Sequence, residues 1–336
     1  LISTQIPTFR VGTLLVLWKM RDLSRDESKV LNEVRSMLSK AKEEMLVEAC
    51  GDELYQWVHD KVQEAAMTLD TTDLNALQFR VGQQLFLGLD ENLLKEDLFN
   101  VIDLINRGTE KDNIEFAELN LRAAKKARGI SAFEASSTYA AKGINMLRSD
   151  VWTMDRSLAL DLYTIGAQMQ LISGNLKIAD EYSNEIFKQE NVSVMETLPL
   201  RIARAWTLSS VESKHVEATE YVINLLRELG HNLIWRPSLA PAQAVSAFPR
   251  TLKLIKEAPK DFYKSLEIVT DPKQKAISDL LHLLHYSSYM SGRLFLAALS
   301  CCKDVELTMK YGITHNSARS FCNLGGFVLH LQEDYG

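Results

Sequence analysis

Apolar residues recur at spacings of three and four along most of the chain, and this periodicity predicts amphipathic helices. The segments that follow it are residues 30–41, 74–87, 93–105, 114–128, 131–147, 158–172, 198–209, 218–229, 277–290, 294–309 and 318–331. Because these segments cover most of the sequence after residue 68, we expect a mainly α fold.

A short stretch before residue 60 follows a different period. Residues 45–47 and 54–58 are rich in apolar and aromatic side chains and flank the turn at residues 50–53, which predicts one β-hairpin. A helix followed by a hairpin is how a winged-helix module ends. Such modules often bind DNA, but the acidic balance of this chain favours a role in packing.

His59 and Asp60 follow this hairpin directly, at the start of the next helical pattern. We expect Asp60 to be the N-cap, with Gln63 at the capping-box position three residues later. The free N–H groups of a helix N-terminus form a natural anion site. The alternative is that the His59 and Asp60 side chains only close a turn through local hydrogen bonds.

One helix connection resembles the turn of a tetratricopeptide repeat. Gly174 and Asn175 form a tight corner, and Ala179, three residues after Leu176, allows two helices to touch. Helical hairpins that cannot bury an apolar face alone must stack, so we expect a TPR-like α-solenoid. An irregular helical domain would give nearly the same pattern, and no strict 34-residue period is present.

Four prolines fall close together after this region, at residues 237, 241, 249 and 259. We expect them to mark an extended or kinked connector, with a sub-boundary at residues 231–260.

Composition narrows the class of protein further. Of 336 residues, 46% are hydrophobic and only 15 are glycine and 7 proline, which favours a folded helical protein over an all-β one. The net charge of −6 argues against a protein that binds nucleic acid or anionic membranes in general. The four cysteines lack the spacing of a disulfide framework, so we expect a cytoplasmic protein. The sequence starts at Leu1 and stops within a helical pattern, as expected for part of a longer polypeptide.

No motif for catalysis stands out. The sequence contains no phosphate loop, dinucleotide fingerprint, nucleophile elbow or kinase catalytic loop. His282 and His285 lie three residues apart on one predicted helix, and Cys301 and Cys302 lie on the next, so a metal site is conceivable. We favour packing roles for all four, and therefore expect no enzyme activity, metal or cofactor of this chain's own.

Residues 55–66 are similar to the element aromatic-x-aromatic-x-His-Asp-Arg-Val-Gln-x-Ala-Ala of a family of large signalling proteins. In that family the element follows an AAA/STAND-type ATPase core, in proteins that also carry a serine/threonine kinase-like domain, a tetratricopeptide-like region and often a sensor histidine kinase. Further matches keep the family's order, at residues 98–108, 117–127, 140–143, 226–230 and 311–312. The resemblance covers the chain from about residue 30 onward.

This resemblance implies that residues 1–68 are the winged-helix end of the ATPase module and residues 69–336 a TPR-like helical region. It places His59, followed by Asp60, near the β-phosphate of bound ADP, with Val58 where the family has Met. ATP or ADP would then meet this chain only through an upstream ATPase core, and its partners would be proteins or other domains of the same polypeptide. The alternative is a stand-alone TPR-like scaffold with no nucleotide role.

Overall fold

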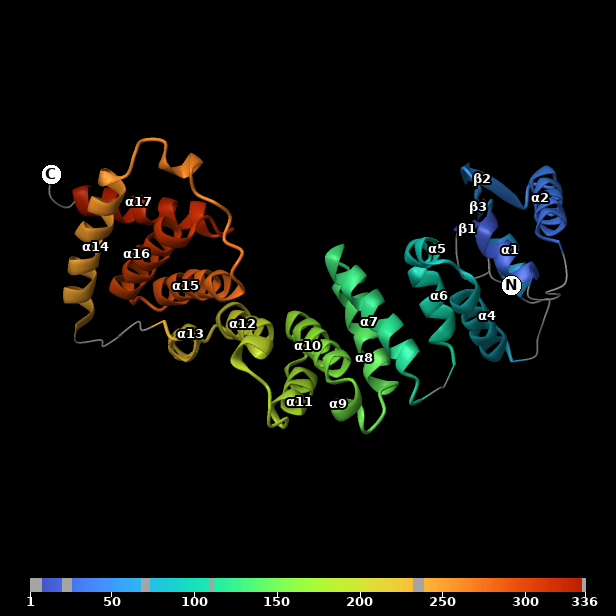
Figure 1. The fold of residues 1–336 in the computed structure, drawn as a ribbon, viewed down its shortest axis with the longest axis horizontal. Coiled ribbons are helices and arrows are strands. Elements are labelled where there is room, and N and C mark those ends of the chain that lie inside the picture. Colours follow the sequence, from blue (N-terminus) through green and yellow to red (C-terminus); the bar gives the residue numbers. More distant parts are fainter. Residues whose placement is uncertain (1–7, 20–25, 68–72, 109–110, 232–238, 334–336) are drawn as a thin grey trace. The chain divides into compact units, whose positions relative to one another are not determined.

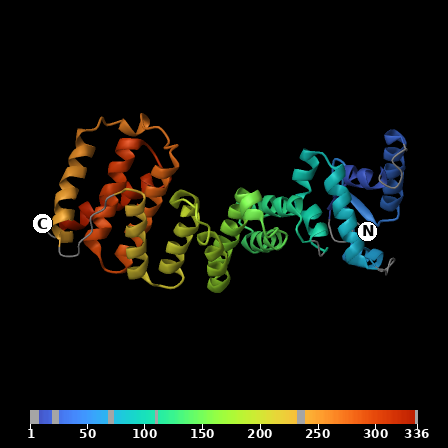
Figure 2. The same ribbon diagram turned by 60° about the horizontal axis from the view of Figure 1, so that its bottom comes forward.

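The computed structural model describes residues 8–19, 26–67, 73–108, 111–231 and 239–333, and these residues are mainly helical. The chain divides into two compact units, Leu1–Leu162 and Tyr163–Gly336. Figure 1 labels their elements, and Figure 2 shows the same ribbon after a rotation. The predicted mainly α fold is confirmed.

The first unit opens with a small three-stranded sheet. Its elements are β1 (Thr8–Arg10), α1 (Val11–Lys19), α2 (Glu27–Glu43), β2 (Val47–Gly51) and β3 (Leu54–Trp57). The strands are antiparallel in the order β1-β3-β2, with Phe9 opposite Tyr55 and Val47 opposite Trp57. The predicted hairpin is therefore confirmed as β2–β3. Strand β1 was not expected, because three residues are too few to establish a period.

A local apolar core holds the sheet against α1 and α2. Its fully enclosed members are Phe9, Val11, Val30, Val34, Leu38 and Val47. Asp26 caps α2 by accepting hydrogen bonds from the N–H groups of Ser28 (2.9 Å) and Lys29 (3.2 Å). The first unit thus begins with a module that has its own core.

Helices fill the rest of this unit. They are α3 (Asp60–Met67), α4 (Leu74–Gly88), α5 (Glu91–Glu96), α6 (Leu98–Ile105), α7 (Ile114–Gly129), α8 (Phe133–Asn145), α9 (Val151–Met154) and the start of α10 (Arg156–Ile172). The single helix expected over residues 93–105 is wrong, since the chain bends at Asp97 between α5 and α6. The buried Asp97 carboxylate accepts a hydrogen bond from the Thr13 hydroxyl (2.6 Å), a partner on distant α1.

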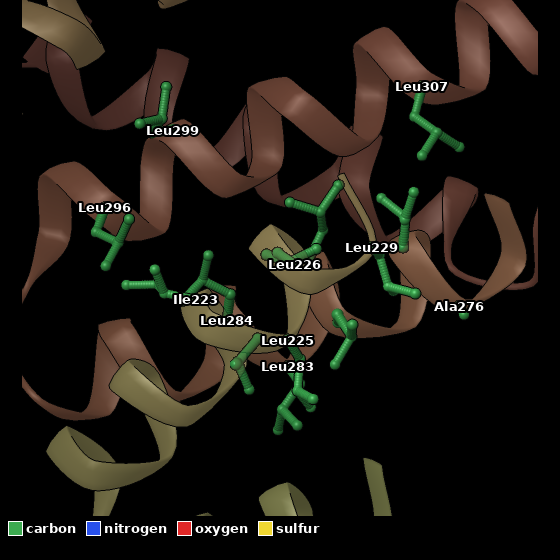
Figure 3. Packing of buried hydrophobic residues seen from close by; sticks show 14 of the residues in the cluster. Ile223, Leu225, Leu226, Leu229, Ala276, Leu283, Leu284, Leu296, Leu299 and Leu307 are labelled. Carbon is green, nitrogen blue, oxygen red and sulfur yellow. The ribbon is translucent and has the colours of Figure 1, made fainter. Parts of the chain in front are cut away.

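Where the structure describes it, the second unit consists of helices and their connections, apart from one isolated bridge between Ile268 and Ile313. Its further elements are α11 (Leu176–Phe187), α12 (Val194–Ser210), α13 (His215–Glu228), α14 (Ala240–Glu257), η3 (Phe262–Lys264), α15 (Pro272–Met290), α16 (Leu294–Tyr311) and α17 (Ser317–Glu333). Leucines of α13, α15 and α16 form the centre of its core (Figure 3).

The extended connector predicted for the proline-rich region is wrong. Residues 240–257 form the continuous helix α14, with Pro241 in its first turn and Pro249 inside it. A first-turn proline gives up an N–H that has no partner within the helix anyway, so Pro241 favours the start of α14. Pro237 lies outside the described residues.

One backbone turn recurs between successive helices and was recognised only once from the sequence. It joins α7 to α8, α10 to α11, α12 to α13 and α15 to α16. In each, a residue with positive φ precedes an N-cap residue with φ between −82° and −89° and ψ between 58° and 69°. The positive-φ residues are Ser131 (61°), Gly174 (76°), Ser213 (53°) and Gly292 (73°).

A small, fully buried residue follows each of these N-caps after four positions. These residues are Ser136, Ala179, Ala218 and Ala297, each 0% exposed. The first three turns lie about 40 residues apart, which is in the range of helical-repeat periods. Shared turn geometry therefore accompanies a shared requirement for close helix contact.

Candidate functional site

His59 lies between β3 and α3, as expected, but its role in the turn differs from the prediction. Asp60 is the first residue of α3 rather than its N-cap. The ring Nδ1 of His59 accepts a hydrogen bond from the Lys61 N–H at 3.0 Å. The imidazole therefore caps the helix, because Nδ1 stands as far from the backbone as the side-chain oxygen of an Asn or Asp cap.

This hydrogen bond determines the tautomer of the neutral His59 ring. A nitrogen that accepts an N–H carries no proton, so in the neutral ring the proton is on Nε2. His59 is exposed and Nε2 is available as a donor. The carboxylate of Asp60 lies in the first turn, where it interacts favourably with the helix dipole and competes with any added anion. Contact of His59 with a nucleotide stays a prediction.

The four residues of the metal hypothesis do not all converge. His285 does approach Cys301, with 2.9 Å between Nδ1 and Sγ, and Nδ1 is also 3.2 Å from the carbonyl oxygen of Ala297. His282, however, pairs with Arg319 through Nε2 at 2.6 Å. Within the described ranges, no three His, Cys, Asp or Glu side chains are grouped so that they could hold a metal.

Burial also keeps the His285–Cys301 pair in its neutral form near pH 7. It raises the pKa of the Cys301 thiol well above its usual value and lowers the pKa of His285. A thiol kept neutral is a poor nucleophile and a poor metal ligand. Burial, with the positive charge of Arg319 as a second cause, likewise lowers the pKa of His282 to about 4. Both histidines are therefore neutral packing residues near pH 7.

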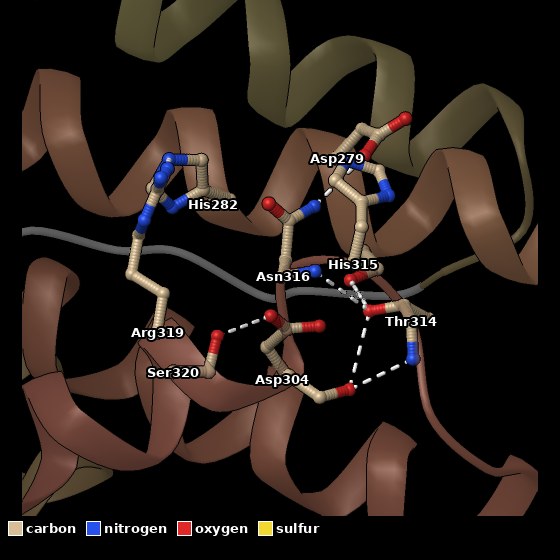
Figure 4. A network of polar contacts seen from close by, with 10 residues as sticks. Asp279, His282, Asp304, Thr314, His315, Asn316, Arg319 and Ser320 are labelled. Atoms are coloured by element: carbon tan, nitrogen blue, oxygen red, sulfur yellow. Dashed lines mark hydrogen bonds and ion pairs between the residues drawn. The ribbon is translucent and has the colours of Figure 1, made fainter.

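A buried polar network missed by the sequence analysis lies where α15, α16 and the start of α17 meet (Figure 4). At its centre is Asp304 of α16, which is 1% exposed and accepts a hydrogen bond from the Ser320 hydroxyl. Its other oxygen, Oδ1, has no hydrogen-bond partner among the described residues. Burial raises the pKa of Asp304 to about 6, although the Ser320 and Ser278 hydroxyls oppose the shift.

Hydroxyl groups extend this network to the corner between α16 and α17. Thr314 Oγ1 lies 2.8 Å from Ser278 Oγ, and the Thr314 N–H donates to Ser317 Oγ at 2.9 Å. Ser317 Oγ is in turn 2.7 Å from Thr308 Oγ1. These bonds connect the three helices around the corner.

Asp279 completes the network on the α15 side. Its Oδ1 accepts a hydrogen bond from Asn316 Nδ2 at 2.8 Å and lies 3.0 Å from the exposed His315 Nε2. Burial raises the pKa of Asp279, and His315 and Asn316 oppose this. Through Ser278, Asp279, Asp304 and Ser320 the network ties α15, α16 and α17 together as a structural clamp.

The sequence did contain one signal for this network. Ala297, Cys301, Asp304 and Thr308 lie on one face of α16 at helical spacing, and a carboxylate inside an otherwise apolar or small-residue face needs a polar partner. The identity of that partner depends on which helices meet, and this is visible only in the structure.

Comparison with known proteins gives no match: no protein-family model, no curated protein and no solved structure is similar to this chain. None of the described helices is long and apolar enough to cross a membrane.

Proposed function

We propose that this chain is a non-catalytic regulatory segment of a signal-transduction ATPase or kinase, in which helical repeats bind a protein partner or another domain. The observation that carries the proposal is the recurring turn that ends at Asn175, Arg293 and their equivalents. One backbone conformation, followed at a fixed distance by a small buried residue, is the construction of tetratricopeptide-like helix pairs. Such repeats present extended surfaces for binding other proteins.

The arrangement of residues 8–67 supports a winged-helix module at the N-terminal side. Two helices precede a β-hairpin, and the first strand pairs with the hairpin's returning strand in the order β1-β3-β2. The module has its own core, as a separate structural unit requires. In this proposal His59 senses the nucleotide state of an ATPase core, donating from Nε2 to a phosphate of ADP.

The test uses two substitutions of His59 in the full-length parent protein. His59→Asn keeps a cap acceptor and removes the distal N–H donor, whereas His59→Ala removes both. We expect both variants to lose retained ADP during desalting, and only His59→Ala to lower the melting temperature. Lys61→Ala, on the exposed side of the same turn, is the matched control.

Retention of ADP by His59→Asn at the wild-type level would show that the ring serves only as a cap. The nucleotide role would then be rejected, and the chain would be a TPR-like scaffold whose partner binding is independent of nucleotide.

A further inference from the structure

The first unit contains an apolar pocket of about 630 Å³ between its small sheet, α1, α2 and α4. Its walls are Phe9, Leu14, Leu17, Trp18, Met37, Leu38, Ala41, Leu46, Val47, Trp57, Leu77, Val81 and Gln84. Gln84, which is exposed, is the only amide or hydroxyl side chain among them. The pocket is thus almost wholly hydrocarbon and aromatic ring.

Its size and lining are those of a small-molecule site. Ligand pockets usually measure about 300–1,000 Å³ and are lined mainly by apolar and aromatic groups. Among the described residues, no charged side chain lines this pocket. The part of a ligand that it encloses is therefore uncharged, because an unpaired charge in such surroundings would be strongly disfavoured.

A second hollow adjoins this pocket and has a different character. It measures about 540 Å³, shares Trp18 and Met37 with the pocket, and is otherwise lined by Asn32, Glu33, Ser36 and Lys40. Asn32, Ser36 and Lys40 are spaced four residues apart, so they lie along one face of α2. There the Trp18 indole N–H donates a hydrogen bond to the Glu33 carboxylate, with 3.2 Å between Nε1 and Oε2.

The apolar pocket shares Trp18 and Met37 with a hollow in which one lysine and two neutral hydrogen-bond donors lie beside Glu33, and this combination fits an elongated molecule with an anionic end. We propose that this site binds a single long-chain fatty acid. Its alkyl chain lies in the pocket among Trp57, Leu77 and Val81, and its carboxylate meets the Lys40 ammonium group. The side chains of Asn32 and Ser36 supply further donors to the carboxylate oxygens. This inference does not depend on the regulatory role proposed above.

The test is titration of the 336-residue chain with dodecanoate below its micelle concentration. Binding is followed by the change in total tryptophan fluorescence, to which Trp18 and Trp57 of the pocket contribute among the five tryptophans. We expect saturable binding of one molecule per chain. Val81→Phe should abolish it by filling the pocket. Lys40→Gln should weaken it about fivefold, which is the upper range for an exposed ion pair. Lys42→Gln, on the same helix but outside both hollows, should leave it unchanged.

Dodecanol has the same alkyl chain as dodecanoate but no carboxylate, so it tests the contribution of the charge. We expect it to bind more weakly than dodecanoate to the wild type and equally to the wild type and Lys40→Gln. Circular dichroism checks that each variant folds, and Leu77→Phe replaces Val81→Phe if the latter does not.

Several outcomes would overturn the proposal. One is the absence of saturable binding, and another is equal binding by the filled-pocket variant, which would indicate adsorption elsewhere. Equal loss of dodecanoate and dodecanol binding in Lys40→Gln would remove the assigned role of the charge. A response to phosphatidylcholine vesicles but not to monomeric dodecanoate would assign the surface to a bilayer instead.

Discussion

Replacing Asp304 by Asn should stabilise the protein at alkaline pH and have little effect at acid pH. The carboxyl is 1% exposed and its Oδ1 has no partner among the described residues, so its charged form is poorly solvated. Asn has nearly the same shape, retains an acceptor for the Ser320 hydroxyl and never ionises. The substitution therefore isolates the effect of the charge.

The magnitude follows from the pKa of Asp304, which burial raises from 3.8 to about 6. As pH rises, the unfolded chain releases this proton near pH 3.8, whereas the folded chain keeps it until about pH 6. Stability therefore falls through this window and remains lower above it. A difference of about two pKa units corresponds to roughly 3 kcal/mol.

Urea unfolding followed by circular dichroism at pH 4 and pH 8 measures this effect. Relative to wild type, Asp304→Asn should shift the urea midpoint upward at pH 8 by about 1 M, for a typical slope of about 3 kcal/mol per M. At pH 4 the two proteins should nearly coincide. Asp180→Asn, at an exposed position on α11, provides the comparison.

Destabilisation of Asp304→Asn by the same amount at both pH values would refute this reasoning. It would show that the carboxylate is ionised in the fold and held by favourable contacts, among them the nearby charge of His315.

Two further substitutions test backbone and hydrogen-bond requirements. Gly312→Ala should lower the free energy of unfolding by at least about 1–3 kcal/mol, because Gly312 has φ +116° and a Cβ would lie 2.3 Å from the Glu267 carbonyl oxygen. Gly325→Ala, where a Cβ meets nothing within 4 Å, should instead leave stability unchanged or raise it in the same thermal melt. Thr13→Val should lower the free energy of unfolding by about 1–3 kcal/mol, because it removes the donor to buried Asp97. Urea unfolding measures this loss. An equal loss in Thr13→Ser, which keeps the hydroxyl, would argue against the hydrogen bond.

Helix positions were predictable because apolar periodicity is a local property of the sequence. The break at Asp97 was not, since its hydrogen-bond partner Thr13 is 84 residues away. Helix α14 was missed because proline was taken as a breaker, although Pro241 lies in the first turn, where it is tolerated. Local pattern therefore located elements better than it located their ends.

The recurring turn was recognised only at Gly174. Serine takes the positive-φ position at Ser131 and Ser213, whereas the turn at Gly292 was missed although it carries glycine. In the candidate site, the sequence pointed to His59, but the role of helix cap was assigned to Asp60, one residue too late. The polar network around Asp304 was invisible because its members come from three helices. Such contacts depend on packing, which a single sequence does not specify.

The recurring helix turn has a consequence for how this chain can evolve. Each of its four occurrences requires one backbone conformation and one small buried side chain. Most outward-facing positions of these helices are left unconstrained by folding. Substitutions can therefore accumulate on the exposed helix faces with little loss of architecture. A lineage built in this way can change its surface rapidly, and its members can lose detectable likeness to one another while keeping the same helical framework.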